Sequence, residues 1–276
     1  MEGVLALNRS GAEVVDEIAA FLVKARREAR GLERFPGSLP TDAAQAYACQ
    51  DAGIALWPDK VAGWKVGWVG EEWRSQFPQE RLVGPVFARA LRLAHTGEVV
   101  DAGIFAQGFA AVEAEFVFRI GEDAPPAIMD WSTEDAAGLV SSMHMGIEIA
   151  SSPLATINDL GPRAIVADFG NNAGLIVGAP IADWRRREIA SLRSSTSING
   201  KPVGNGGAVT LSGGPLAALA FALGHCALRG VPLRAGQFVC TGATTGIHAV
   251  AVGDEAEMVF EGAGTLHCRL REMSPC

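Results

Sequence analysis

The spacing of apolar residues changes near residue 61, and this change constrains the fold more than any other feature of the sequence. Upstream, Ser10 and Glu13 form a capping pair before a stretch with apolar residues at helical spacing. Thr41 can cap a second helix, which is expected to end at about Trp57 because a proline follows. Residues 1–60 are therefore predicted to form a helical N-terminal segment.

Downstream, glycines and β-branched residues become more frequent, and short alternating runs separated by turn signals replace the long periodic ones. Asn199-Gly200 between two such runs predicts a type I′ hairpin. Two helices are expected among the strands, at Thr133 to Met143 and at Pro215 to Arg229. The predicted strands are 62–69, 111–120, 145–150, 174–177, 188–198 with its hairpin partner, 238–241, 247–252, 255–261 and 265–270. The sequence thus predicts an α+β fold, in which the helical segment packs on a large mixed or antiparallel β core formed by residues 61–276 as one compact unit.

Composition excludes several classes of function. The chain has 23 basic and 31 acidic residues and a net charge of −8, so nucleic acid is not an expected partner. No stretch reaches the roughly 18 uncharged apolar residues of a membrane-spanning helix. Half of the residues are apolar (49%), so the chain has enough apolar side chains to bury surface at the subunit interface of a homo-oligomer. Five cysteines without a Cys-x-x-Cys pair suit free thiols in a reducing compartment, and the N-terminus lacks the features of a secretion signal, so a cytoplasmic location is expected.

Two carboxylates are predicted to share one face of the strand at 111–120. Strand periodicity places Glu113 and Glu115 on one side and the apolar residues of this run on the other. Two negative charges on neighbouring positions of one strand face are unfavourable unless water screens them, one is protonated, or a cation lies between them. The sequence alone leaves two interpretations open, a solvated outer face and a cation site.

A third carboxylate, Glu148, lies between β-branched residues in the predicted strand 145–150. Taken alone, it is compatible with an ordinary edge-strand glutamate. Three carboxylates from two strands, without a histidine or cysteine cluster, would suit an oxygen-ligated ion such as Mg²⁺ or Mn²⁺ and disfavour zinc.

Lys65 shares its face of the predicted strand 62–69 with two glycines, Gly63 and Gly67. A lysine flanked in this way leaves room for a ligand, and partial burial or a neighbouring cation would lower its pKa toward the range useful for proton transfer. The alternative is a lysine on the wet side of a half-buried strand.

Taken in order, these motifs resemble the 2-keto-4-pentenoate hydratase and 4-oxalocrotonate decarboxylase branch of the fumarylacetoacetate hydrolase superfamily. The motifs are Gly63-Trp64-Lys65-Val66-Gly67, Val112-Glu113-Ala114-Glu115 and Gly146-Ile147-Glu148-Ile149. Further matches in the same order are Ala167-Asp168, Asn199-Gly200, Gly214-Pro215, Thr241-Gly242 and Gly253-Asp254. The resemblance spans nearly the whole chain, and its specificity comes from the number of ordered matches.

The resemblance implies a fumarylacetoacetate hydrolase-type β core and a divalent ion, Mg²⁺ or Mn²⁺, held by Glu113, Glu115 and Glu148. The carboxylate and 2-oxo or 2-enol oxygens of a small 2-oxo acid substrate would complete the coordination, and Lys65 would orient this ligand or shuttle a proton. Asp168 matches a family position near the substrate. Thr241, in a glycine loop after a predicted strand, is a candidate for binding the substrate carboxylate, with turn capping as the alternative.

The sequence departs from the family at two places. Leu82 occupies the position of an acid that helps to move a proton in the hydratases, and Asn171-Asn172 replace expected hydroxyls. The first hypothesis is a metal-dependent lyase of aromatic-compound breakdown, hydratase-like in preference to decarboxylase-like. The second is a non-catalytic partner subunit, because hydratases and decarboxylases of this branch associate with each other.

Overall fold

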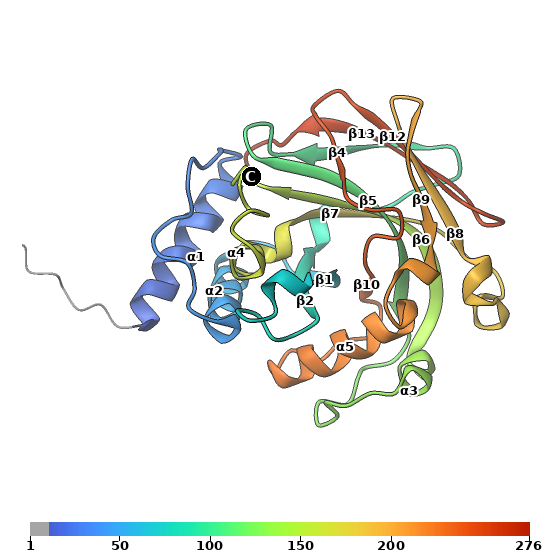
Figure 1. Ribbon diagram of the computed structural model, residues 1–276, viewed down its shortest axis with the longest axis horizontal. Coiled ribbons are helices and arrows are strands. Elements are labelled where there is room, and N and C mark those ends of the chain that lie inside the picture. Colours follow the sequence, from blue (N-terminus) through green and yellow to red (C-terminus); the bar gives the residue numbers. More distant parts are fainter. Residues whose placement is uncertain (1–10) are drawn as a thin grey trace, which may run out of the picture.

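The structure is a computed structural model and describes residues 11–276 (Figure 1). The N-terminal helices are α1 (Gly11–Arg27) and α2 (Ala43–Leu56), which pack against each other. Ser10, the expected cap of the first helix, lies outside the described residues. Asp42, and not Thr41, caps α2, because its Oδ1 accepts a hydrogen bond of 2.8 Å from the amide of Gln45. The first strand begins at Val61.

Two sheets form the β core. The larger has the order β2-β1-β10-β5-β6-β7-β3, with β11 paired to β5, and the smaller has the order β4-β13-β12-β8-β9. The strands of the larger sheet are β1 (Val61–Trp68), β2 (Arg81–Phe87), β3 (Leu91–Leu93), β5 (Phe109–Ile120), β6 (Val140–Ser152), β7 (Asn172–Pro180), β10 (Phe238–Cys240) and β11 (His248–Ala249). Those of the smaller are β4 (Val99–Ile104), β8 (Arg193–Ile198), β9 (Lys201–Gly207), β12 (Glu255–Phe260) and β13 (Gly264–Glu272). Both sheets are mixed, since β1–β10, β3–β7 and β4–β13 pair in parallel and the other pairs are antiparallel.

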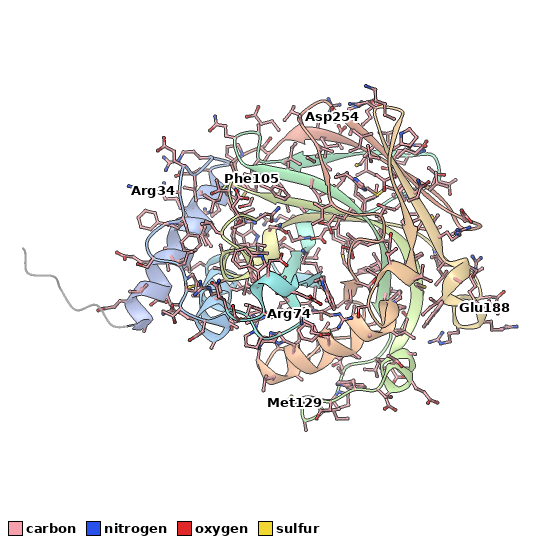
Figure 2. The ribbon with its side chains drawn as sticks, in the orientation of Figure 1. Arg34, Arg74, Phe105, Met129, Glu188 and Asp254 are labelled. Atoms are coloured by element: carbon pink, nitrogen blue, oxygen red, sulfur yellow. The ribbon has the colours of Figure 1, made fainter. Side chains whose placement is uncertain are left out.

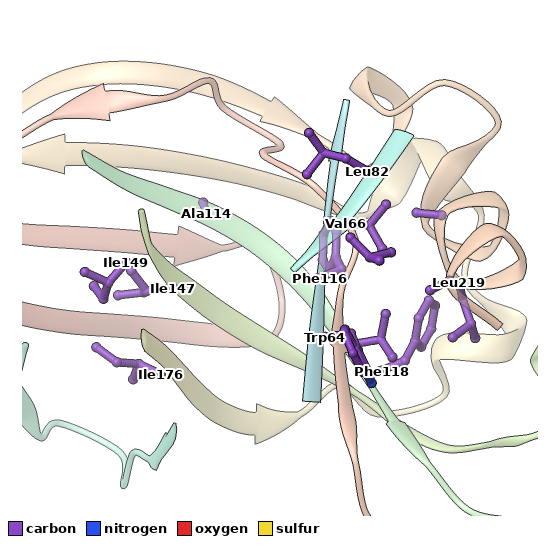
Figure 3. Close-up of a cluster of buried hydrophobic side chains, with 14 of the residues drawn as sticks. Trp64, Val66, Leu82, Ala114, Phe116, Phe118, Ile147, Ile149, Ile176 and Leu219 are labelled. Atoms are coloured by element: carbon purple, nitrogen blue, oxygen red, sulfur yellow. The ribbon is translucent and has the colours of Figure 1, made fainter. Parts of the chain in front are cut away.

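Three further helices cover the core: α3 (Thr133–Gly138), α4 (Pro162–Ala167) and α5 (Gly214–Leu228). Figure 1 shows α1, α2 and α4 at one end of the molecule and α5 along one side, with the smaller sheet opposite. The main apolar cluster lies among the two sheets and α5. Trp64, Phe118 and Leu219 come together beside α5, and Ile147 and Ile176 extend the cluster along β6 and β7 (Figure 3).

The predicted α+β fold with a large mixed β core is confirmed, and so is the hairpin, because Asn199 (φ 51°) and Gly200 (φ 72°) both have the positive φ of a type I′ turn. The helix predicted at Thr133 to Met143 is wrong beyond Gly138. From Val140 onward the chain is strand β6, whose pairing with β5 outweighs local helix preference.

Other boundaries also differ from the prediction. The start of the predicted strand 188–198 is a short 3₁₀ turn, Ile189–Ser191, and only His248–Ala249 of the predicted strand 247–252 pairs in the sheet. Strands β2, β3 and β4 and helix α4 were not predicted. All five cysteines are free thiols, as expected. Within residues 11–276, no helix combines the length and apolar composition needed to cross a bilayer.

Candidate active site

The three predicted carboxylates meet in the middle of the larger sheet. Glu113 on β5 lies directly opposite Glu148 on β6, and Glu115 is two residues farther along the same face of β5. One oxygen from each carboxylate lies within 4.8 Å of the others. Their exposed fractions are 6% for Glu113 and 0% for Glu115 and Glu148. These carboxylates are therefore on neither a solvated face nor an edge strand, since β6 has partners on both sides.

Two of these carboxylates have one oxygen bound by the protein and one oxygen without a partner. Oε2 of Glu115 accepts a hydrogen bond of 2.7 Å from the amide of Gly242, and Oε1 of Glu148 accepts one of 2.9 Å from Nδ2 of Asn172. Oε1 of Glu115 and Oε2 of Glu148 are buried and have no hydrogen-bond partner. Buried oxygens without a donor are costly, and a cation bound between them would remove that cost.

The electrostatics of the carboxylates indicate the same need for positive charge. Burial and the neighbouring charge of Glu148 raise the pKa of Glu113 to about 8, although Lys65 opposes this. Burial, Glu148 and Glu113 raise the pKa of Glu115 well above its usual value. Three full negative charges are thus unfavourable here until a cation joins them.

Lys65 lies beside these carboxylates on β1, where it pairs with Gly84 on β2 and Cys240 on β10. Its Nζ is 3.4 Å from Oε1 of Glu148, and only 5% of the residue is exposed. The alternative of a lysine on a wet surface is thus excluded. Burial disfavours the charged form, but Glu148 and the other two glutamates outweigh this effect and raise the pKa of Lys65 above its usual value. The side chain is therefore held as an ammonium group, and the lowered pKa expected from the sequence is wrong, because the three carboxylates outweigh burial.

The space around Lys65 depends on glycines. A Cβ at Gly67 would lie 3.5 Å from Nζ of Lys65 and 3.1 Å from Cδ1 of Leu82, and one at Gly170 would lie 3.2 Å from Cδ of Lys65. Both flanking glycines were expected to leave room for a ligand, and the position of Gly67 supports this. The expectation is wrong for Gly63, which lies against the backbone of β10, since a Cβ there would be 2.4 Å from the carbonyl oxygen of Phe238.

A cavity of about 620 Å³ opens beside Lys65 and Glu113. Its walls come from the ends of β1 and β2, the turn after β10, and the segment Val209–Ser212 before α5. Leu82, where the family resemblance led us to expect an acid, is 3% exposed and forms part of the wall. The cavity therefore has a charged end at Lys65 and Glu113, and no carboxylate at position 82.

The two candidate substrate-binding residues differ in position. Thr241 lines the cavity, but its hydroxyl donates a hydrogen bond of 2.7 Å to the carbonyl of Phe116, so only its oxygen lone pairs face a ligand. Asp168 is not brought to this cavity. Its carboxylate is buried and accepts two hydrogen bonds from Arg26 of α1, at 2.5 Å from Nε and 2.9 Å from Nη2. The position of Asp168 thus supports a structural role and not substrate binding.

From the sequence, no role was assigned to Asn171 and Asn172, but in the structure Asn171 contacts Lys65 and Asn172 contacts Glu148. Nζ of Lys65 donates to Oδ1 of Asn171 at 3.5 Å, while Asn172 holds Glu148. Phe169 (φ 57°), Gly170 (φ 67°) and Asn171 (φ 53°) form three consecutive left-handed residues, a conformation that costs energy for the two residues that are not glycine. The Gly-Asn-Asn run directly before a predicted strand was the available signal for this turn.

Comparisons of the sequence with known proteins find relatives among hydratases and decarboxylases. No model of a known protein family matches the chain. The chain is 29% identical to 2-hydroxyhexa-2,4-dienoate hydratase of Comamonas testosteroni over an alignment of 163 residues. This alignment covers 58% of this chain and 60% of the relative. It is 30% identical to 4-oxalocrotonate decarboxylase of Pseudomonas putida over an alignment of 106 residues, which covers 38% of this chain and 40% of the relative. The chain thus spans about half the length of the curated relatives it matches.

Solved structures match over a larger share of the chain. The 4-oxalocrotonate decarboxylase of Pseudomonas putida G7, complexed with magnesium and adipate, has a TM-score of 0.75 and 22% identity, covering 94% of this chain and 97% of that one. The chain therefore shares its overall fold with this decarboxylase. Fumarylpyruvate hydrolase of Pseudomonas aeruginosa, in complex with Mn²⁺ and pyruvate, has a TM-score of 0.58 and 17% identity. The match covers 78% of this chain and 91% of the hydrolase. The resemblance to the hydratase and decarboxylase branch, inferred from the sequence, is confirmed by these similarities.

Proposed function

We propose that the chain is a divalent-metal-dependent lyase that acts on a small 2-oxo or 2-hydroxydienoic acid, as 2-keto-4-pentenoate hydratases do. The observation that carries this proposal is the pair of buried carboxylate oxygens without partners, Oε1 of Glu115 and Oε2 of Glu148, beside the carboxylate of Glu113. Carboxylate oxygens are the ligands that Mg²⁺ and Mn²⁺ prefer, so these residues fit the ion. When bound, the ion would supply Lewis-acid stabilisation of the charge that develops on a 2-oxo oxygen.

The protein groups around this position have separate tasks. Gly242 and Asn172 each hold one carboxylate oxygen, which leaves the other oxygen free to face the ion. The ammonium group of Lys65 lines the cavity and would attract and orient the anionic end of a substrate, or deliver a proton to it. Thr241 directly follows Cys240, the β10 partner of Lys65, and its oxygen could accept a hydrogen bond from a protonated group of the substrate, such as an enol hydroxyl.

A decarboxylase-like activity is the second candidate, and Leu82 favours it. Hydration of a dienol needs a proton donor near the reacting carbons, whereas loss of CO₂ from an oxo-diacid takes place readily next to an apolar wall. Leu82 provides such a wall and no proton.

The experiment that tests the proposal uses purified chain and Mg²⁺ with 2-hydroxypenta-2,4-dienoate and, separately, with 4-oxalocrotonate. Loss of dienol absorbance without CO₂ indicates hydration, and release of CO₂ indicates decarboxylation. Lys65→Ala is expected to bind Mg²⁺ like the parent and to lose turnover. Metal binding without turnover of either compound would refute the lyase proposal for the isolated chain.

A gain of activity on mixing such an inactive chain with a sister hydratase or decarboxylase would instead support the partner-subunit hypothesis. Homo-oligomerisation and a cytoplasmic location stay predictions from the sequence.

A further inference from the structure

The charged end of the cavity is bordered by an apolar side chain on the strand next to Lys65. A Cβ at Gly67 would lie 3.5 Å from Nζ of Lys65 and 3.1 Å from Cδ1 of Leu82. Gly67 and Leu82 are partners in the β1–β2 register, so Leu82 shares the face of Lys65. The ammonium group and the leucine methyl are therefore neighbours, and a ligand held by Lys65 also contacts hydrocarbon.

A second apolar side chain lies beside the glutamates. A Cβ at Gly242 would lie 3.3 Å from Cδ2 of Leu211, and the amide of Gly242 is the group that holds Oε2 of Glu115. Val209 is two residues upstream of Leu211, and both line the cavity. Because Val209 is 59% exposed, the segment before α5 presents hydrocarbon from the carboxylate cluster to the mouth of the cavity.

The third apolar side chain at the charged end is Ile247, which directly precedes strand β11. The first residue of β11 pairs with Val112 on β5, so the antiparallel register places Ile247 next to Glu113. Both Ile247 and Glu113 line the cavity, yet Ile247 is 59% exposed and Glu113 is buried. Ile247 therefore lies where the carboxylate cluster meets the mouth of the cavity.

Two polar side chains of the rim have partners within the protein. Arg81 pairs with Trp68 in the β1–β2 register and so lies on the face opposite to Lys65. Its guanidinium lies over the ring of Trp68 and donates to a carbonyl of the segment before α5, and Arg74, labelled in Figure 2, lies over the same ring. The hydroxyl of Thr210 is directed at two backbone carbonyls, at 2.8 and 2.9 Å. These groups hold the rim together and leave apolar side chains to face a ligand.

The cavity is larger than a five- or six-carbon acid requires. Its volume of about 620 Å³ falls within the range of about 300–1,000 Å³ for sites that enclose drug-sized ligands. A short acid bound at Lys65 and the glutamates would leave Val209 and Ile247 uncovered. Exposed apolar groups beside a binding site gain free energy when hydrocarbon of a ligand covers them.

We propose that Val209 and Ile247 determine specificity by covering the hydrocarbon tail of a 2-oxo or 2-hydroxydienoic acid that is longer than the five- and six-carbon acids considered above. This inference rests on the proposed function, since it takes the 2-oxo end as bound at the carboxylate cluster. A hydrocarbon tail has no second carboxylate to lose as CO₂, so the inference belongs to the hydratase-like activity. Each methylene that this wall covers would strengthen binding about two- to fourfold.

The test uses three stable ligands that differ only in the tail: pyruvate, 2-oxopentanoate and 2-oxooctanoate. Each is titrated by calorimetry into the Mg²⁺-loaded parent and into three variants, Ile247→Asn, Val209→Asn and Val203→Asn, after thermal melting has shown which variants are folded. Val203 is the matched control, because it is a 43% exposed residue of β9 that does not line the cavity.

The ratio of affinities between ligands is the quantity to compare. In the parent and in Val203→Asn, 2-oxooctanoate is expected to bind about tenfold or more tightly than 2-oxopentanoate, because three further methylenes are covered. In Ile247→Asn and in Val209→Asn this ratio should fall at least about threefold, because a polar amide replaces part of the apolar wall. Val209→Asn keeps the test valid if Ile247→Asn does not fold.

The outcomes separate this inference from the proposed function. Equal affinity of the parent for 2-oxopentanoate and 2-oxooctanoate would overturn the inference while leaving 2-oxo acid binding intact. So would a ratio that is the same in the parent and in both wall variants. Binding of none of the three acids by the Mg²⁺-loaded parent would overturn the proposed function itself, and the inference with it.

Discussion

Replacing Arg26 tests whether Asp168 has a structural role. The side chains of Arg26 and Asp168 are 4% and 0% exposed, and two hydrogen bonds join them. Arg26 also donates to the carbonyls of Ser151 (3.2 Å), Asn172 (2.8 Å) and Asp168 (3.0 Å), so it joins α1 to the chain around β6 and β7. Arg26→Leu would leave a buried carboxylate without a partner.

The expected loss in the free energy of unfolding is about 3–5 kcal/mol for Arg26→Leu, the range for breaking a buried ion pair from one side. Asp168→Asn should cost less, about 1.5–3 kcal/mol, because the guanidinium keeps its three carbonyl acceptors. The matched control is Glu255→Gln at the exposed pair with Arg269 (2.7 Å), where about 0–1 kcal/mol is expected.

Urea unfolding at pH 7 in the presence of a chelator measures all three losses. A loss for Arg26→Leu no larger than that of the exposed control would refute the reasoning. So would a fully stable Asp168→Asn variant that no longer binds a 2-oxo acid, because that result would return Asp168 to the substrate site.

Three further predictions concern the site and its surroundings. Asn172→Ala should weaken Mn²⁺ binding about tenfold or more in calorimetry, because Oε1 of Glu148 would lose the hydrogen bond that orients this carboxylate. Unchanged affinity would exclude this positioning role. Gly84→Ala should lose at least about 2 kcal/mol in urea unfolding, since its Cβ would lie 2.3 Å from the carbonyl oxygen of Phe169, whereas Gly138→Ala, with nothing within 4 Å, should lose none. Burial and the nearby Arg229 lower the pKa of His225 to about 4, so stability should fall by up to about 3 kcal/mol as the pH drops from 6.5 to 4. In His225→Leu this acid-dependent loss should shrink; an identical pH profile would contradict it.

Local periodicity was sufficient to predict that Glu113 and Glu115 share a strand face, but not that three carboxylates form a cluster. The alternation of residues 111–120 places Glu113 and Glu115 on one face, and the short apolar strand around Glu148 pairs with it in the structure. What periodicity could not supply was the register, which places Glu148 opposite Glu113 and buries all three residues. The family resemblance suggested that convergence, and the structure brings the carboxylates together.

Other features depend on contacts between distant parts of the chain. Asp168 is 142 positions from Arg26, and no local pattern reveals that the two meet. Strand β2 contains Gly84 and Pro85, which weaken a strand signal, yet it pairs with β1 over its whole length. The error after Gly138 has the same origin, because pairing with β5 determines the conformation of Val140 onward.

Binding of Mn²⁺ by Glu115→Gln and by the parent tests the central claim most directly. Calorimetry on chelator-treated protein should show one Mn²⁺ site in the parent and in the surface control Glu122→Gln, and loss of that site in Glu115→Gln. Without metal, Glu115→Gln should melt at the same temperature as the parent or higher, because a neutral amide replaces a buried carboxyl group whose pKa is raised by burial and by Glu148. Equal Mn²⁺ affinity in the parent and Glu115→Gln would contradict the metal site.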